Sequence, residues 1–227
     1  RECSIQRRHQ KLIEESPSPA LTSETREAME AAVERACREL GYVNAGTFEF
    51  LLGPEGDPYF IEVNCRLQVE HPVTELVTGI DVVREQIRVA DGADLSHIGR
   101  AVRSGHAIEV RINAEDPARG FAPAPGVVTR FRPPLGPGVR VDTAMFEGAM
   151  IPPHYDSLIA KLIVHDETRA AAIARAIRAL REFEIEGIPT TRDLAIDVLR
   201  SREFAGGMYS TSYLEEMEGR LPSLAPA

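Results

Sequence analysis

Tryptophan is absent from this 227-residue sequence, cysteine is rare, and no apolar run is long enough to span a bilayer. The three cysteines, Cys3, Cys37 and Cys65, lack the spacing of metal ligands, and their odd number provides no disulfide framework. A reducing, cytoplasmic environment is therefore expected. Basic residues are also in deficit, because 26 Lys and Arg accompany 35 Asp and Glu, for a net charge of -9. This balance argues against nucleic acid and against a membrane surface as partners.

The opening residues, "RECSIQRRHQK", contain no apolar segment of the kind found in signal peptides. They begin without Met, in the middle of an alternating segment, so we expect a fragment or a processed product of a longer protein. The length is still sufficient for one large domain or two modest ones, each with its own core.

Residues 1–92 are expected to form the first structural region. A Pro- and Ser-rich loop at 16–23 ends at Thr22 or Ser23, either of which can cap a helix that stops at Gly41. Two strand-like runs, "AGTFEFLL" and "YFIEVN", are separated by "GPEGDP", and this pattern predicts a hairpin. Residues 72–92 predict one or two further helices, with Asp81 as an internal cap.

Strands dominate the second expected region, residues 93–221, which begins with the polar link "DGADLSHIGRAVRSG". Four runs rich in β-branched residues suggest one antiparallel sheet: "HAIEVRINA", "GVVTRFRPP", "GVRVDTAM" and "SLIAKLIVHD". Two helices, "ETRAAAIARAIRALREFEI" and "TTRDLAIDVLRSREF", should cover one side of this sheet. The tail, residues 222–227, is expected to fray. The predicted fold class is α+β.

The stretch "FIEVNCRLQVEH" at residues 60–71 has a polar side chain at every even position from Glu62 to Glu70. In an extended strand these side chains share one face. A hairpin of constant register places Glu49 opposite Glu62, with Asn64 on the same side. Like charges destabilise such a pair unless a cation compensates, and two carboxylates with an amide oxygen are suitable ligands for Mg²⁺. A solvent-facing hairpin is the alternative, and a slip of one residue would separate the carboxylates.

Further polar residues suit an anionic substrate and a proton acceptor. They are Arg66, Gln68 and Glu70 in the same file, and Gln6, His9 and Lys11 in the opening "QRRHQK". Taken by itself, "QRRHQK" is more typical of a solvated basic strand than of a site.

Five motifs together carry a family resemblance: "QRRHQK", "GTFEFL", "FIEVNCRLQVEHPVTE", "GHAIEVRINAED" and "PPHYDSLIAKLI". In this order they closely resemble biotin carboxylase, the ATP-grasp component of biotin-dependent carboxylases. The resemblance runs from Arg1 to about Leu214. It implies the C-terminal portion of an ATP-grasp domain over residues 1–92 and a biotin carboxylase C-terminal domain over residues 93–221.

The resemblance also implies roles for individual residues. Glu49, Glu62 and Asn64 would hold the divalent ions, Mg²⁺ or Mn²⁺, that bridge the phosphates of ATP, with Gln6 and His9 near the nucleotide. Bicarbonate would be bound by Lys11, Arg66, Gln68 and the backbone of Val69. The implied catalytic set is Lys11, Arg66, Glu70 and Arg111.

The implied reaction begins when Glu70 takes the proton of bicarbonate, which attacks the γ-phosphate of ATP and gives carboxyphosphate. Carboxyphosphate would release CO₂ and phosphate, and phosphate would deprotonate biotin. Arg111, near both bicarbonate and biotin, would stabilise the biotin enolate. Arg111 should therefore point toward the same cleft as Arg66 and Glu70, because "EVRIN" turns Ile108, Val110 and Ile112 the other way.

Two departures from the family pattern are present. Cys65 occupies a position where the family usually carries Thr, Ser or Pro, and its odd parity predicts that it faces away from the ligands. No glycine-rich phosphate loop precedes the metal residues, and "FAGGM" at 204–208 lacks the lysine of such a loop. The chain is therefore expected to be the C-terminal half of the enzyme, with little activity in isolation.

The partners that the resemblance implies are a biotin carboxyl carrier protein or domain, a carboxyltransferase component and a second copy of the full-length enzyme. The final carboxyl acceptor stays open between acetyl-CoA, propionyl-CoA and pyruvate. Two other interpretations also stay open: another ATP-grasp ligase similar to carbamoyl phosphate synthetase, and a non-catalytic assembly module.

Overall fold

The computed structural model describes residues 1–224, which divide into two compact units. The sheet unit contains Arg1–Pro17 together with residues 104–224, and the hairpin unit is Ser18–Arg103. Helices and antiparallel strands are mixed in the order expected of the α+β class, which is confirmed. The sequence suggested a division at residue 92, but the first 17 residues pack in the same compact unit as residues 104–224. They do so because β2 pairs with β5, far along the chain.

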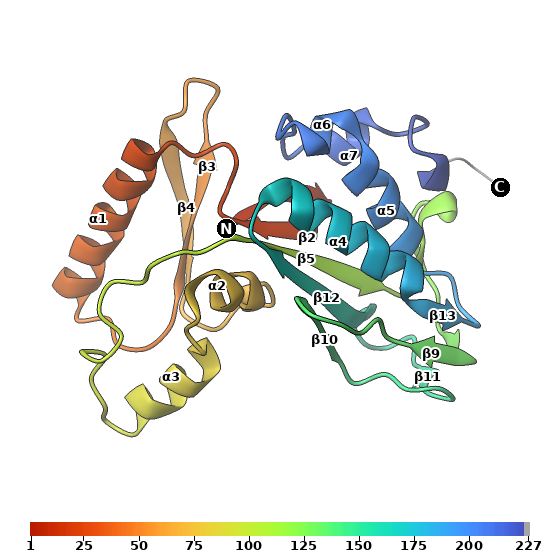
Figure 1. Ribbon diagram of the computed structural model, residues 1–227, viewed down its shortest axis with the longest axis horizontal. Coiled ribbons are helices and arrows are strands. Elements are labelled where there is room, and N and C mark those ends of the chain that lie inside the picture. Colours follow the sequence, from red (N-terminus) through yellow and green to blue (C-terminus); the bar gives the residue numbers. More distant parts are fainter. Residues whose placement is uncertain (225–227) are drawn as a thin grey trace. The chain divides into compact units, whose positions relative to one another are not determined.

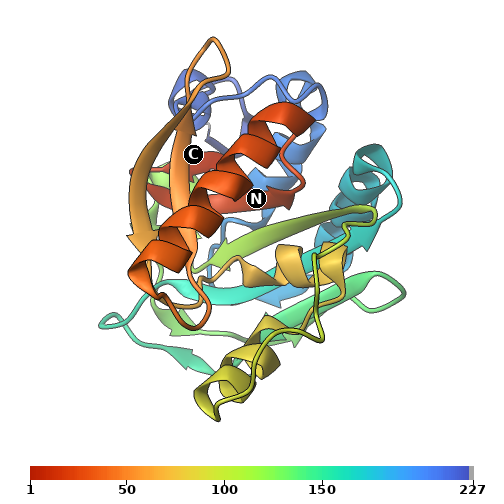
Figure 2. The same cartoon turned by 90° about the vertical axis from the view of Figure 1, so that its left-hand side faces the viewer.

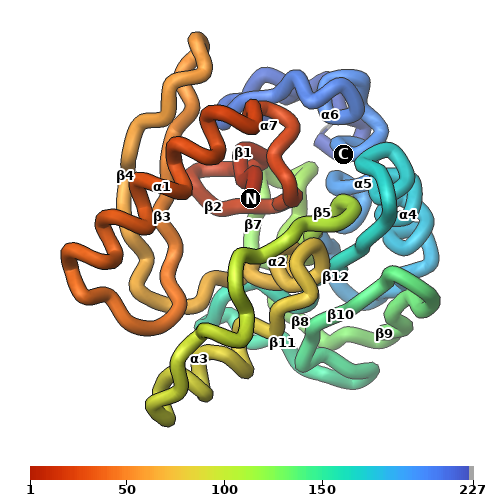
Figure 3. The backbone as a smooth tube through the Cα atoms, turned by 60° about the vertical axis from the view of Figure 1, so that its left-hand side comes forward, coloured from red at the N-terminus to blue at the C-terminus, as the bar shows by residue number. Residues whose placement is uncertain are grey.

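The main sheet of the sheet unit has five strands in the order β1-β2-β5-β12-β10, all antiparallel (Figure 1). Their bounds are β1 (Glu2–Arg7), β2 (Gln10–Ser16), β5 (His106–Asn113), β10 (Val139–Thr143) and β12 (Leu158–Asp166). Ile13 of β2 lies opposite Val110 of β5, so apolar residues face the same side on both strands. Figure 3 shows the first two strands beside β5.

Helices cover one face of this sheet. They are α4 (Arg169–Glu182), α5 (Arg192–Arg200), α6 (Arg202–Ala205) and α7 (Tyr213–Glu216). Helix α4 packs on β12 and β5, and α5 packs on α4 (Figure 1). The even positions of β5, including Ile108 and Ile112, are fully buried in the core with Leu180 of α4. The prediction that helices cover one side of the sheet is confirmed.

A buried ionic cluster joins β2 to the C-terminal helices on the same face. Glu15, 1% exposed, accepts hydrogen bonds from Nε of Arg169 at 2.7 Å and from the hydroxyl of Tyr209, and its carboxylate lies 2.6 Å from Nε2 of His106. Burial by itself raises the pKa of Glu15, but hydrogen bonds from His106, Arg169 and Tyr209 hold that pKa below its ordinary value. Burial and the nearby carboxylate raise the pKa of Tyr209. The cluster therefore depends on an ionised Glu15.

Shorter ladders replace part of the single sheet that the sequence suggested. They are β6 (Glu115–Asp116) with β7 (Ala122–Pro123), β8 (Gly126–Val127) with β11 (Met150–Ile151), and β9 (Arg130–Arg132) with β13 (Glu184–Glu186). A short 3-10 helix, η1 (Pro117–Arg119), joins β6 to β7. The expected strand at 126–134 is thus split between two partners, because Val128 and Thr129 bond to different segments, Ala149 and Glu186.

The C-terminal helices differ from the expectation in two places. Helix α4 ends at Glu182, and the following residues pair as β13 instead of extending the helix. The next predicted helix breaks at Ser201, whose hydroxyl accepts from the backbone N–H of Phe204 at 3.1 Å and so caps α6. After the first break, residues 184–186 form hydrogen bonds with β9, and at the second break the Ser201 hydroxyl accepts from the N–H of Phe204. Backbone groups that lack a partner within a helix are satisfied in this way.

The described part of the tail is ordered, contrary to the expectation that residues 222–227 fray. Pro222–Leu224 forms the 3-10 helix η2, and the N–H of Ser223 donates to Asp197 of α5 at 2.9 Å. Leu224 packs against the core. The remaining residues, 225–227, lie outside the described range.

The hairpin unit contains α1 (Ser23–Leu40), β3 (Thr47–Leu52), β4 (Pro58–Asn64), α2 (His71–Thr78) and α3 (Val82–Ala90). Helix α1 runs beside the β3–β4 hairpin in Figures 1 and 2. Its N-cap is Thr22, which accepts from the N–H of Thr25 at 3.0 Å, and its C-cap is Gly41 with φ 60°. Asp81 caps α3 by accepting from the N–H of Arg84 at 2.8 Å. These predicted helix ends are confirmed.

The link after α3 contains no helix or strand between residues 91 and 103. Arg100 and Arg103 of this link contact Glu30 of α1. The hydrogen bond from Arg103 holds the pKa of Glu30 below its ordinary value. Within the part of the chain that the structure describes, no helix is both long and apolar enough to cross a membrane.

Candidate active site

Two carboxylates face each other across the β3–β4 hairpin. Glu49 pairs with Glu62, and Thr47 pairs with Asn64, so the register predicted from the sequence is confirmed at this end of the hairpin. The side-chain amide of Asn64 donates to Glu49 at 3.2 Å and to Glu62 at 2.8 Å. All three side chains therefore lie on one side of the hairpin and within hydrogen-bond distance of Asn64.

The register shifts one residue beyond the carboxylate pair. Phe50 pairs with Phe60, so Ile61 is the extra residue of a bulge. The two aromatic rings are 5.9 Å apart at their centroids, with an edge-to-face angle of 73°. The constant register expected over the whole hairpin is therefore wrong near the turn. The bulge lies on the turn side, and the carboxylate pair keeps its alignment.

The polar file beyond Asn64 is not a strand. β4 ends at Asn64, and residues 65–70 form a loop that leads into α2. Gln68 and Glu70 are buried, 6% and 2% exposed, whereas the apolar Val69 is 36% exposed. Glu70 is the N-cap residue of α2 and has φ -84° and ψ 14°, a conformation that no strand uses. The alternation of polar and apolar residues predicted an extended strand through Glu70, and this prediction is wrong for residues 65–70.

The loop nevertheless returns to the carboxylates. Nε2 of Gln68 donates to Oε1 of Glu49 at 2.5 Å, and Nη2 of Arg66 donates to Oδ1 of Asn64 at 3.0 Å. Five of the predicted site residues are therefore in one hydrogen-bonded group, which we call the amide cluster: Glu49, Glu62, Asn64, Arg66 and Gln68. Cys65 lies between two members of the cluster and is exposed.

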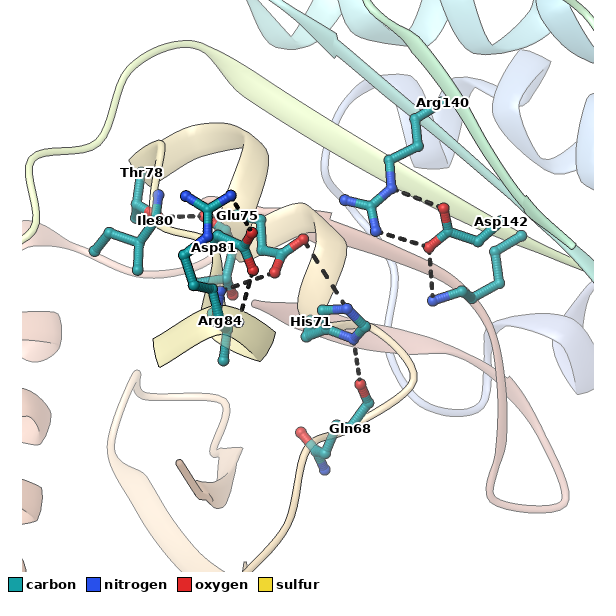
Figure 4. Close-up of polar contacts among 12 residues, drawn as sticks. Gln68, His71, Glu75, Thr78, Ile80, Asp81, Arg84, Arg140 and Asp142 are labelled. Atoms are coloured by element: carbon teal, nitrogen blue, oxygen red, sulfur yellow. Dashed lines mark hydrogen bonds and ion pairs between the residues drawn. The ribbon is translucent and has the colours of Figure 1, made fainter. Parts of the chain in front are cut away.

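Helix α2 holds the loop in place (Figure 4). The carbonyl of Gln68 accepts from the backbone N–H of His71 at 3.2 Å and lies 2.8 Å from Nδ1 of the same residue. Nε2 of His71 lies 4.0 Å from Glu75, which in turn accepts from the N–H of Val82 at 2.9 Å. The main chain of Gln68 is thereby tied to α2 and, through Glu75, to α3, while its side-chain amide extends to β3.

The donor set of the amide cluster fits a hard divalent cation. Two carboxylates in register and one amide oxygen are all oxygen ligands, which Mg²⁺ and Mn²⁺ prefer. Among residues 1–224 no group of three His, Cys, Asp or Glu side chains could hold a metal ion. A site here would therefore rest on the two carboxylates of Glu49 and Glu62, with the amide oxygen of Asn64 as the third protein ligand.

The nucleotide candidates of the sheet unit lie on the β1–β2 hairpin. Gln6 pairs with Lys11 on the neighbouring strand, and Arg8 and His9 form the turn, with φ 48° and 65°. Both turn residues are left-handed, as a tight two-residue hairpin requires. This conformation leaves His9 exposed, while Gln6 and Lys11 are half-buried. The opening segment is thus a hairpin, and the roles of its residues stay predictions.

Arg111 lies on the face of β5 that is opposite the helices. Its Nε donates to Glu14 of β2 at 2.6 Å, and its Nη2 lies 2.5 Å from the same oxygen. Glu14 is fully buried and pairs in register with Glu109, which is also fully buried. Sequence reasoning missed Glu14, for which the available signal was an acidic residue inside the strand "KLIEES". That Arg111 shares a cleft with Arg66 and Glu70 stays a prediction.

A second ion cluster follows on the same face. Lys161 of β12 pairs with Arg111 on one side and with Asp142 of β10 on the other. Asp142 accepts from Arg140 at 2.7 Å and 2.9 Å and lies 3.4 Å from Lys161 (Figure 4). Burial raises the pKa of Asp142, but the two cations hold it below its ordinary value. Two neighbouring cations, Arg111 and Lys161, therefore lie between the carboxylates of Glu14 and Asp142 on this face of the sheet.

Two family models divide the chain between them. Residues 1–98 match the ATP binding domain of the carbamoyl-phosphate synthase L chain, and residues 109–216 match the biotin carboxylase C-terminal domain. Biotin carboxylase from Nostoc sp. is 53% identical over 96% of this chain and 49% of its own length. Biotin carboxylase 1 from Bacillus subtilis is 54% identical over 95% of this chain and 48% of its own.

The chain belongs to the biotin carboxylase family. It spans about half the length of the curated relatives it matches. The biotin carboxylase domain of a thermophilic 2-oxoglutarate carboxylase, solved with bicarbonate, superposes with a TM-score of 0.92 at 48% identity, over 95% of this chain and 49% of that one. Biotin carboxylase from Campylobacter jejuni superposes with a TM-score of 0.91 at 45% identity, over 94% and 48% of the two chains.

Both parts of the resemblance stated from the motifs are thus present in this chain. The metal candidates lie in the part that matches the ATP binding domain, and Arg111 lies in the part that matches the C-terminal domain. The two family models meet between residues 98 and 109, close to the expected boundary at residue 92. The packing units divide elsewhere because β1 and β2 complete the sheet of the C-terminal part.

Proposed function

We propose that this chain supplies the metal, bicarbonate and biotin residues of an enzyme that carboxylates biotin with ATP and bicarbonate. The observation that carries the proposal is the amide cluster, in which two opposed carboxylates, an amide, a guanidinium and a second amide converge. This is an unusual combination for a structural hairpin, since carboxylates directly opposite each other are destabilising. It suits a site that binds a divalent cation beside an anion.

The chemistry assigns one role to each group. Glu49, Glu62 and Asn64 would hold Mg²⁺ or Mn²⁺, which supplies charge neutralisation at the phosphates of ATP. Arg66 offers a planar fork of donors that suits bicarbonate, and Gln68 adds an amide donor. We assign the remaining bicarbonate contacts to Lys11 and the backbone of Val69, and contacts with ATP to Gln6 and His9.

Phosphoryl transfer would follow from this arrangement. Glu70 takes the proton of bicarbonate, and a bicarbonate oxygen forms a bond to the γ-phosphorus as the bond to ADP breaks. The carboxyphosphate that results breaks down to CO₂ and phosphate, and phosphate removes the proton of biotin. Arg111, with its permanent charge, stabilises the biotin enolate until CO₂ adds to it. Glu14 orients Arg111 through the hydrogen bond at 2.6 Å.

Related proteins support these ligands and leave the acceptor open. One solved relative is a complex of a 2-oxoglutarate carboxylase domain dimer with MgADP and bicarbonate. Other relatives are the small subunit of 2-oxoglutarate carboxylase, the alpha3 subunit of a biotin-dependent acyl-coenzyme A carboxylase and the biotin carboxylase subunit of pyruvate carboxylase. We propose a biotin carboxyl carrier protein or domain, a carboxyltransferase component and a second copy of the full-length protein as partners. A cytoplasmic location stays a prediction.

The test uses the full-length protein and separates two rates. ATP cleavage should require bicarbonate and rise with free biotin, and carboxybiotin should form. Arg111→Ala should abolish biotin carboxylation and spare much of the slow ATP cleavage, whereas Glu70→Ala should reduce both rates. Arg181→Ala, which removes an exposed arginine of α4, is the control and should leave both unchanged.

Three outcomes would contradict the proposal. ATP cleavage that depends on ammonia would favour a carbamoyl phosphate synthetase reaction, to which the first family model also points. No binding of Mg²⁺ and ATP in a calorimetric titration would favour a non-catalytic module. Equal suppression of both rates by Arg111→Ala would refute the division into a phosphoryl-transfer part and a biotin part.

A further inference from the structure

We propose that the amides of Asn64 and Gln68 occupy the cation site of the amide cluster until a divalent cation displaces them, and that this displacement releases Arg66 and Gln68 to bind bicarbonate. The inference rests on the proposed function, because it assumes that Glu49 and Glu62 hold the cation. It adds that the cation site and the anion site cannot form independently.

The first step concerns the carboxylate oxygens. Oε1 of Glu49 accepts from both amides, at 2.5 Å from Gln68 and 3.2 Å from Asn64, and Oε1 of Glu62 accepts from Asn64 at 2.8 Å. Each of these contacts directs an N–H group toward an oxygen that would ligate the cation. An amide nitrogen has no available lone pair and its hydrogens carry positive charge, so it cannot share that oxygen side with a cation. Binding therefore requires the amides to turn away.

The second step concerns Asn64, whose amide nitrogen donates hydrogen bonds and whose amide oxygen accepts one. Its Nδ2 faces the carboxylates, while its Oδ1 accepts from Arg66 at 3.0 Å. To become a ligand, Oδ1 must replace Nδ2 on the carboxylate side, which takes half a turn about the bond to the amide carbon. That rotation leaves a donor facing Nη2 of Arg66, so this hydrogen bond is lost and Nη2 can bind an anion, while Nη1 keeps its contact with the carbonyl of Leu67.

The third step concerns Gln68, which is not among the metal candidates. When a cation binds Glu49, Nε2 of Gln68 loses its hydrogen bond to that carboxylate. The N–H groups of this amide can then donate to an anion. The main chain of Gln68 does not need to move, because its carbonyl accepts from the N–H of His71 at 3.2 Å and stays tied to α2. Only the side-chain end changes partner. Cation and anion affinities are then linked, and each ligand must strengthen the other by the same factor.

The decisive variant is Gln68→Leu, which keeps the bulk of a side chain that is 6% exposed and removes its donor. Mn²⁺ binding to the 227-residue chain, followed by electron paramagnetic resonance, should be about ten-fold tighter in Gln68→Leu than in the wild type, the scale of one charge-assisted hydrogen bond. Gln86→Leu, on α3 of the same unit, is the matched control and should bind Mn²⁺ as the wild type does.

A second measurement on the unaltered chain avoids any folding defect of the variant. In ¹⁵N spectra, saturating Mg²⁺ should shift the side-chain amide pair of Gln68, identified by its absence from Gln68→Leu. Mn²⁺ binding that is unchanged or weaker in Gln68→Leu, or amide signals that ignore Mg²⁺, would overturn the inference. So would a wild-type chain that binds no Mn²⁺.

These outcomes are distinguishable from failure of the proposed function. The full-length protein could show bicarbonate-dependent ATP cleavage while the Gln68 amide ignores Mg²⁺, which would reject the amide displacement alone. Conversely, the amide could respond to Mg²⁺ in a protein that does not carboxylate biotin, which would reject the reaction and retain the displacement.

Discussion

Replacement of Arg111 by Ala should destabilise the protein as well as alter the proposed reaction. Glu14 is fully buried, and Arg111 contacts it through Nε at 2.6 Å and Nη2 at 2.5 Å. Arg111→Ala removes this cationic partner and leaves the buried carboxylate with fewer donors. Removal of one partner of a buried ion pair costs about 3–5 kcal/mol, so we expect a loss near the lower end of that range, because the Arg111 side chain is 16% exposed.

A double-mutant cycle can assign this cost to the pair. Glu14→Gln removes the charge that Arg111 neutralises, so the double variant should lose less stability than the sum of the two single variants, with a coupling free energy of about 2 kcal/mol. The assay is urea-induced unfolding followed by circular dichroism at pH 7. Arg181→Ala should change the free energy of unfolding by less than about 0.5 kcal/mol.

The reasoning would be refuted if Arg111→Ala cost less than about 1 kcal/mol, or if the two substitutions proved additive. The result also bears on kinetics. A catalytic defect of Arg111→Ala is informative only at a temperature at which that variant is still folded. Glu14→Gln, which keeps Arg111 but weakens its orientation, should then reduce biotin carboxylation less than Arg111→Ala does.

Three further predictions follow from the caps, turns and buried ions. The pKa of Glu15 is lowered in the fold, so its ionised form stabilises the protein above the ordinary pKa of 4.5. The free energy of unfolding of the wild type should therefore fall as the pH drops through and below that value. In urea titrations from pH 6 to 3, this fall should be steeper for the wild type than for Glu15→Gln. Gly187→Ala should lower the melting temperature strongly, because φ is 97° and a Cβ would lie 2.3 Å from the carbonyl of Val127, whereas Gly56→Ala, with φ 88° and open space, should cost only about 1 kcal/mol. Thr22→Ala should cost about 1 kcal/mol by loss of the N-cap of α1, measured by the same unfolding assay.

Local signals predicted the elements that depend on neighbouring residues. The ends of α1 follow from Thr22 and Gly41, and the turn residues between the two strand runs fix the β3–β4 hairpin. A constant register predicted that Glu49 and Glu62 lie on one side of the hairpin, but the register beside the turn would by itself pair Glu49 with Ile61, and the bulge is what brings Glu62 opposite Glu49. The bulge at Ile61 could not be deduced, since nothing in the alternation marks which residue is left unpaired.

Residues 65–70 show the limit of periodicity. The alternation of polar and apolar residues continues through Glu70, but the chain leaves the strand at Asn64 because α2 begins at His71 and its first turn contains Pro72. Gln68 reaches Glu49 by this loop rather than along the strand. The membership of Gln68 in the site was therefore predicted by chemistry and resemblance, and its route was decided by tertiary structure.

The sequence by itself determined the longer helices, the β3–β4 hairpin, the acidic pair and the family, because each is encoded in residues that are neighbours in the chain or in motifs of fixed order. Only the tertiary structure decided which distant segments meet. It joined β2 to β5, which are far apart in the chain, brought Glu14 to Arg111 and gathered Glu15, His106, Arg169 and Tyr209 into one buried cluster. Such pairings depend on the burial of apolar faces and the satisfaction of charges between elements, which leave no periodic trace in either segment alone.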